Sequence, residues 1–88
     1  MIAWTDCMLR TLPRLITAVR MENERQLGKW GLQTHSPAEW SAIIAEEEGE
    51  LAKELCEANW RTPDRVAIRA EAIQVATLAL KIAEMCDQ

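Results

Sequence analysis

The sequence predicts an all-α protein that forms one small domain and associates with copies of itself. Apolar residues recur at helical spacing over three long stretches, and two of these stretches open with strong helix-start signals. Tyr and Phe are absent, and the 88 residues include only three glycines and three prolines, too few for a β-sandwich or a loop-rich fold. A chain of this length buries only about 60–65% of its unfolded surface. We therefore expect a single domain over residues 1–88 that needs oligomerisation for support.

The first predicted helix covers about residues 13–27. Its leucine, isoleucine and valine side chains keep roughly one face, and Gly28 and Gly31 mark its end. The preceding residues 1–11 fit either a short extra helix or a packed arm. Residues 28–36 form a connector.

The second predicted helix covers residues 37–58 and begins with a capping box. Ser36 can cap the helix, Pro37 suits the first helical position, and Glu39 can reach back to the cap. Trp40 is the first residue of its apolar stripe, and we expect it in the core.

The third predicted helix covers residues 63–85, with Thr62 as its cap. The turn that precedes it is short, so the second and third helices should be antiparallel neighbours. The third helix is apolar on most of its surface, and two other helices of one chain cannot cover it. The sequence thus predicts an antiparallel bundle of three main helices that is completed by a second copy, as a dimer or a tetramer.

Charge and cysteine content exclude several classes of protein. The formal net charge is −4, which argues against nucleic acid as a partner. No stretch is long and apolar enough to span a membrane, and the first residues do not resemble a signal peptide. Three widely spaced cysteines suit free thiols in the cytoplasm better than a disulfide framework.

Two glutamates interrupt apolar stripes. Glu47 lies between Ile44 and Leu51 on the stripe of the second helix, and Glu71 lies on the stripe of the third. Glu50 shares the face of Glu47, because residues three apart on a helix are neighbours. Crowded carboxylates repel one another in a partly dry site, and a divalent cation such as Mg²⁺ removes this conflict.

These acids have two simpler structural roles open to them. A glutamate-rich stretch such as residues 46–50 is often only a solvated helix face. Glu47 and Glu71 could also form ion pairs with basic side chains, namely Lys53, Arg65 or Arg69. The single histidine, His35, is expected to form hydrogen bonds near the start of the second helix rather than to act as a base.

The acidic motif resembles a known family. The stretch Glu46-Glu47-Glu48-Gly49-Glu50, followed by Glu71, is similar to the Glu-Glu-x-x-Glu … Glu-x-x-Asp signature of MazG-like all-α nucleoside triphosphate pyrophosphatases. Upstream, Lys29-Trp30-Gly31-x-Gln33-x-His35 resembles the first-helix and loop region of short phage and mobile-element members. The resemblance covers about residues 22–85.

The resemblance implies a function. Such enzymes use Mg²⁺, or Mn²⁺ in its place, to cleave nucleoside triphosphates into monophosphate and pyrophosphate, often to clear unwanted nucleotides from the cell. It implies metal ligands at Glu47, Glu50, Glu71 and Gln74, with catalytic roles for Glu46 and Glu47. Gln74 stands where the family has Asp; it keeps an oxygen but loses a charge, so we expect weaker metal binding. Substrate contacts are expected from three cations and an aromatic ring: Arg25, Lys29, Lys53 and Trp30.

A second hypothesis comes from a different class. The same helical scaffold could serve as a non-catalytic oligomeric interaction protein. Each of the basic residues is more simply an ordinary surface cation, and Lys29 is the strongest exception because it lies in the resembling motif.

Overall fold

Three α-helices make up the regular structure of the chain. The computed structural model describes residues 8–58 and 64–88, and all regular structure within these residues is helical. Helix α1 covers Met8–Trp30, α2 covers Pro37–Glu57 and α3 covers Arg65–Cys86. The predicted all-α class with three helices is therefore confirmed for the described residues. The expected cap Thr62 and most of the arm lie outside them.

Helix α1 is longer at both ends than the sequence predicted. It begins at Met8 and includes Pro13, although an interior proline lacks the N–H donor and its ring crowds the carbonyl oxygen four residues earlier. It also continues through Gly28 and ends at Trp30, just before Gly31, whose φ of 70° lies in the left-handed region that favours glycine. The backbone N–H of Gly31 donates to the carbonyl oxygen of Leu27 at 2.8 Å and closes the helix.

Helices α2 and α3 begin with side-chain caps. The capping box of α2 is confirmed: the Glu39 N–H donates to Ser36 Oγ at 3.2 Å, and the Ser36 N–H donates to Glu39 Oε1 at 2.9 Å. Helix α3 starts two residues later than predicted, since Asp64 is its N-cap and accepts the N–H of Ala67 at 3.0 Å.

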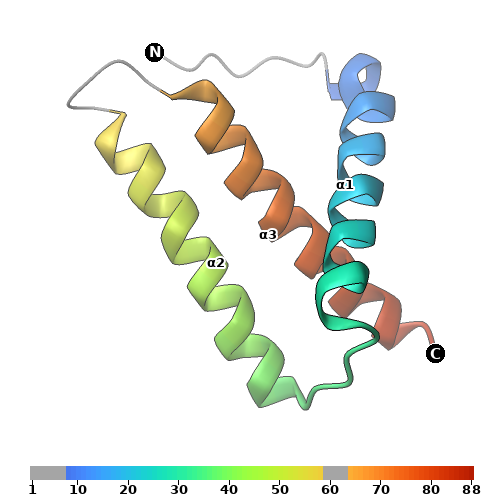
Figure 1. The fold of residues 1–88 in the computed structure, drawn as a ribbon. Helices are drawn as coiled ribbons and strands as arrows, with labels where there is room; N and C mark the ends of the chain where they lie inside the picture. Colours follow the sequence, from blue (N-terminus) through green and yellow to red (C-terminus); the bar gives the residue numbers. More distant parts are fainter. Residues whose placement is uncertain (1–7, 59–63) are drawn as a thin grey trace.

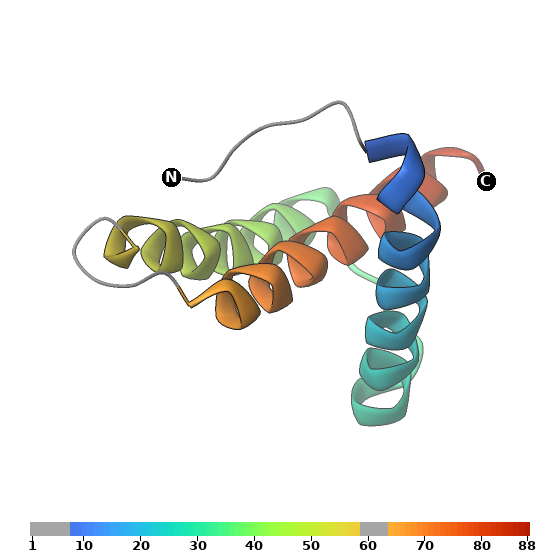
Figure 2. The same ribbon diagram turned by 90° about the horizontal axis from the view of Figure 1, so that it is seen from above.

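Helix α3 is the central element of the fold. It packs against both α2 and α1, whereas α1 and α2 make no backbone approach to each other within the described residues. Figure 1 shows α2 and α3 side by side, and Figure 2 shows α1 lying across α3 at a steep angle. The second half of α1 lies against the second half of α3, where Gln26 contacts Lys81.

The core of one chain is small. Trp40 and Leu78 are the buried large hydrophobic residues of the described part, which confirms the expectation for Trp40, and Thr77 is buried beside Leu78. By contrast, Val66 is 81% exposed and Leu80 is 51% exposed on α3, the helix that the sequence predicted to be covered. Coverage of these side chains by a second copy stays a prediction.

Candidate functional site

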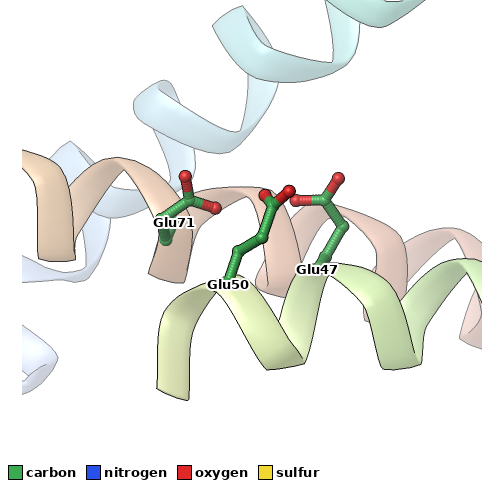
Figure 3. A group of neighbouring side chains, drawn as sticks. All are labelled: Glu47, Glu50 and Glu71. Atoms are coloured by element: carbon green, nitrogen blue, oxygen red, sulfur yellow. The ribbon is translucent and has the colours of Figure 1, made fainter. Parts of the chain in front are cut away.

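Three carboxylates from two helices converge on the packed side of α2 and α3. Glu47 and Glu50 are one helical turn apart on α2, and Glu71 comes from α3 (Figure 3). One carboxylate oxygen from each residue lies within 4.8 Å of the other two. Glu47 and Glu71 are half-buried, and Glu50 is exposed. We call these three residues the acidic cluster.

Repulsion and burial act together on this cluster. Burial is the largest cause that raises the pKa of Glu47, followed by the charges of Glu50, Glu71 and Glu46. The pKa of Glu71 is also raised, first by burial and then by the charge of Glu50. Each of the two raised groups has one buried oxygen, Oε2, with no hydrogen-bond partner in the described part of the chain. The cluster thus combines unpaired acceptor oxygens with unbalanced negative charge.

No basic side chain of residues 8–58 and 64–88 forms an ion pair with the acidic cluster. Within residues 8–58 and 64–88, no ion pair joins Glu47 or Glu71 to Lys53, Arg65 or Arg69. The ion-pair interpretation of these two glutamates is therefore wrong for the described residues. A hard divalent cation fits this donor set, because carboxylate oxygens are the ligands that Mg²⁺ prefers.

Helix α1 contributes a paired acid and base beside the cluster. The guanidinium of Arg25 donates to both Glu22 oxygens, at 2.9 and 2.7 Å. This contact is the largest cause that holds the pKa of Glu22 below its ordinary value. The charge of Glu22 in turn contributes to the raised pKa of Glu71, and the charge of Glu47 contributes to the raised pKa of Arg25. Arg25, an expected substrate contact, therefore lies within electrostatic reach of the cluster.

The other expected ligands lie around the cluster rather than in it. Glu46 is exposed on α2 next to Glu47. Gln74 is half-buried one turn after Glu71 and lines a groove of about 410 Å³ between α1 and α3, together with Arg25 and Arg69. Gln74 thus faces a groove with two guanidinium groups, and the sequence did not predict Arg69 as a contact there.

The expected phosphate and base contacts divide into two groups. Lys29 and Trp30 lie together at the end of α1, with the Lys29 ammonium 4.6 Å and the Arg25 guanidinium 5.9 Å from the centre of the Trp30 ring. Cations of the same helix therefore cover the aromatic surface that was expected to stack on a base. Lys53 is exposed on α2.

His35 behaves as a structural residue. Its ring packs edge-on against Trp40 with the ring centres 4.8 Å apart. Its Nε2 lies 3.3 Å from Gln33 Oε1, and its Nδ1 lies 3.8 Å from Glu39 Oε2. These contacts fix the entry into α2, as the sequence indicated.

A polar network at the other end of α3 was not predicted from the sequence. Lys81 donates through Nζ to Gln26 Oε1, and Gln26 Nε2 donates to Glu22 Oε2 at 2.7 Å. Burial lowers the pKa of Lys81, and Glu22 raises it in part. The spacing of Glu22, Arg25 and Gln26 on one helix face was a signal for part of this network. Lys81 had no such signal, because Gln26 is 55 positions away.

Comparison of the chain with protein-family models, with curated proteins and with solved structures gives no match. The resemblance to MazG-like enzymes is therefore carried by the quoted residues alone and stays a hypothesis. In the described residues, no helix combines the length and the apolar character that crossing a membrane requires.

Proposed function

We propose that the protein is a Mg²⁺-dependent nucleoside triphosphate pyrophosphohydrolase that converts a (d)NTP and water into a (d)NMP and pyrophosphate. One observation carries this proposal: oxygens of Glu47, Glu50 and Glu71 converge within 4.8 Å, and two of these glutamates have buried oxygens without partners among residues 8–58 and 64–88. Like charges held together in this way are costly unless a cation binds. The resemblance to the MazG-like signature at the same residues supports the reaction type.

The residues of the acidic cluster would hold the metal ion, with the amide oxygen of Gln74 as a further ligand. When bound, Mg²⁺ or Mn²⁺ neutralises phosphate charge and acidifies a water molecule. Glu46 and Glu47 are the candidates to accept a proton from the attacking water. The bond between the α and β phosphates breaks, the water supplies a hydroxyl group to one product, and pyrophosphate leaves.

Basic side chains would orient the phosphates. Arg25 lies within electrostatic reach of Glu47, and Arg69 shares the groove of Gln74. Lys29, Trp30 and Lys53 stay candidate substrate contacts in this proposal. Positioning and charge neutralisation supply most of the rate enhancement in phosphoryl transfer, so these cations would act on the rate as well as on binding.

The proposal includes an assembly and a location. The chain would be one protomer of an antiparallel helical bundle, completed by a second copy or as a tetramer, and it would clear nucleotides in the cytoplasm. The exposed apolar residues Val66 and Leu80 on α3 support this assembly. Light scattering should give a mass of at least twice the 10.0 kDa of one chain; a folded monomer would refute the oligomer.

The alternative is a non-catalytic oligomeric interaction protein on the same scaffold. The observation that favours it is the exposure of large apolar side chains, with Met21 at 66% and Val66 at 81%. A Mg²⁺ titration followed by a pyrophosphate assay over a panel of (d)NTPs separates the two functions. Release of pyrophosphate from at least one nucleotide supports the enzyme, whereas absence of both metal binding and release would leave the interaction protein.

A further inference from the structure

A hydrogen-bonded group on α1 lies beside the acidic cluster and holds an arginine. The carboxylate of Glu22 accepts three hydrogen bonds, from Nε and Nη2 of Arg25 at 2.9 and 2.7 Å and from Nε2 of Gln26 at 2.7 Å. The Glu22 side chain is only 11% exposed, whereas the Arg25 side chain is 49% exposed. Glu22 is thus the enclosed partner of this ion pair, and Arg25 is the partner nearer to solvent.

The contacts that hold Glu22 extend to a second helix. Gln26 is buried, and its Oε1 accepts a hydrogen bond from the Lys81 ammonium of α3. This contact joins two helices that cross at a steep angle (Figure 2). Because Glu22 is tied through Gln26 to the neighbouring helix, its carboxylate has a fixed place, and the guanidinium of Arg25 is fixed with it.

Arg25 has an alternative partner in the acidic cluster. After Glu22, Glu47 is the acid whose charge contributes to the raised pKa of Arg25. Glu47 is half-buried, and its Oε2 has no hydrogen-bond partner in the part of the chain that the structure describes. A guanidinium matches a carboxylate well, since its N–H groups can form two parallel charge-assisted hydrogen bonds. Two acids therefore compete for Arg25, and Glu22 is the one that binds it.

Position along the chain explains this outcome. Glu22 precedes Arg25 by three positions on the same helix, so the two side chains meet on one helix face. Glu47 belongs to α2, and α1 and α2 make no backbone approach to each other within the described residues. A contact with Glu47 requires the long arginine side chain to extend toward α2, and its two hydrogen bonds with Glu22 prevent this.

We propose that Glu22 is a positioning residue, which holds Arg25 away from Glu47 and so keeps the acidic cluster open to a divalent cation. The cation in this inference rests on the proposed function, whereas the hold on Arg25 rests on the hydrogen bonds of Glu22. Without Glu22, the guanidinium is free to donate to the unpaired oxygen of Glu47. It would then neutralise part of the cluster and compete with the metal ion for the same oxygens.

The first test needs no metal and compares melting temperatures at about pH 8, where glutamates are ionised. In the otherwise unsubstituted protein, Glu47→Gln removes a repelling charge and should raise the melting temperature. In a Glu22→Gln background, the same substitution removes the new partner of Arg25 and should lower the melting temperature. The sign of the shift therefore reports which acid binds Arg25.

Glu24→Gln is the matched control, because it removes the same charge from an exposed position of α1. In that background, Glu47→Gln should still raise the melting temperature. An equal rise in the Glu22→Gln background would overturn the proposal, since Arg25 would then have no contact with Glu47 to lose. Helical circular dichroism checks the fold. If Glu22→Gln does not fold, Glu22→Asp replaces it with the same expected lowering, because the shorter side chain withdraws the carboxylate from the guanidinium.

The second test measures Mg²⁺ binding by calorimetry without nucleotide. Glu22→Gln should weaken Mg²⁺ binding about tenfold, the lower end of the loss for outer-shell partners of a metal. A double variant with Arg25→Met should return to within about threefold of the unsubstituted protein, because the competing cation is gone and the two substitutions are not additive. A double variant as weak as Glu22→Gln alone would overturn the proposal, since loss of the Glu22 charge would then explain the whole effect.

The two proposals fail separately. Absence of Mg²⁺ binding, together with the reversed melting shift in the Glu22→Gln background, would overturn the hydrolase and keep Glu22 as the residue that positions Arg25. Mg²⁺ binding and pyrophosphate release that do not respond to Glu22→Gln would overturn the role of Glu22 and keep the enzyme.

Discussion

Helix α3 carries two ionisable side chains on its packed side, ten positions apart, and their surroundings differ in kind. Glu71 faces Glu47 and Glu50, which have the same charge, and one of its oxygens is buried without a partner in the described part of the chain. Lys81 faces Gln26 and, beyond it, the negative charge of Glu22. The acidic end is thus uncompensated, and the basic end is compensated by the chain itself.

This difference separates an acidic cluster without partners in the described residues from a polar network whose members pair with one another. A fold that needed polar groups only for packing would pair them, as it does around Lys81 through Gln26 and Glu22. Among the residues that the structure describes, no such pairing occurs at Glu71, although Arg65 and Arg69 are close in sequence. Carboxylates held together without partners cost stability, and protonation or the proposed cation would each lower that cost.

Removing one acid at the uncompensated end should have the largest effect. Glu71→Gln keeps the size of the side chain and removes a metal ligand, so metal-dependent pyrophosphate release should fall by more than about a hundredfold, since even outer-shell partners of a metal are worth about 10–100-fold. The helical circular dichroism should be unchanged. Glu48→Gln, on an exposed position of α2, is the matched control and should retain full turnover. Unchanged turnover in the Glu71 variant would exclude Glu71 as a ligand.

At the compensated end, the expected loss is in stability. Gln26→Ala removes the bridge between Lys81 and Glu22 and leaves buried donors and acceptors unpaired. The free energy of unfolding in urea should fall by about 1–3 kcal/mol. Glu24→Ala, on the exposed side of the same helix, should change it by less than about 0.5 kcal/mol. Equal effects of the two substitutions would mean that the network adds nothing to stability.

Local signals in the sequence predicted much of the fold and part of the site. The capping box at Ser36 and Glu39 and the burial of Trp40 follow from short-range patterns, and both are present. The convergence of Glu47 with Glu71 was predicted because each acid interrupts an apolar stripe. These features depend on residues a few positions apart, or on a helical pair joined by a short turn.

Features that depend on crossing angles could not be predicted. The steep crossing of α1 over α3 brings Gln26 to Lys81, and no sequence spacing encodes that angle. The predicted start of α1 at Pro13 was also wrong, since prolines favour the first turn of a helix but here a helical turn precedes it. The sequence therefore did not indicate that Glu22 and Arg25 of α1 lie beside the acidic cluster.

The two ends should also respond to pH in opposite directions. The pKa values of Glu47 and Glu71 are raised in the folded state, so protonation of these two groups favours folding. The stability that this protonation supplies is present at low pH, and it is lost as the pH rises through the raised pKa values of the folded state. The pKa of Glu22 is lowered, so its contribution is present above the ordinary value of 4.5 and is lost as the pH falls below it. Without divalent cations, the melting temperature should rise as the pH drops from about 8 toward about 5 and then fall in stronger acid.

Metal and substitution sharpen this pH test. Mg²⁺ should raise the melting temperature more at about pH 8 than at about pH 5, because protons compete for the same oxygens. In a Glu47→Gln, Glu71→Gln double variant, the rise between about pH 8 and about pH 5 should disappear while the acid loss remains. A melting temperature that falls steadily from about pH 8 downward in the unsubstituted protein would contradict the raised pKa values of the cluster.

Two glycines give the smallest and most local comparison of the two ends. Gly31 follows the last residue of α1 with a φ of 70°, and Gly49 lies on α2 one position from Glu50 in a helical conformation. Gly31→Ala should cost about 1–2 kcal/mol, because a Cβ is strained in the left-handed region. Gly49→Ala should stabilise the chain by up to about 1 kcal/mol, since an added Cβ has no atom within 4 Å and alanine is the better helix former. Urea unfolding measures both changes, and a loss of stability in Gly49→Ala would show that another chain packs against α2 beside the acidic cluster. Pyrophosphate release measured on the same variant separates a second case, in which stability rises but turnover falls because the substrate needs the space that the glycine leaves.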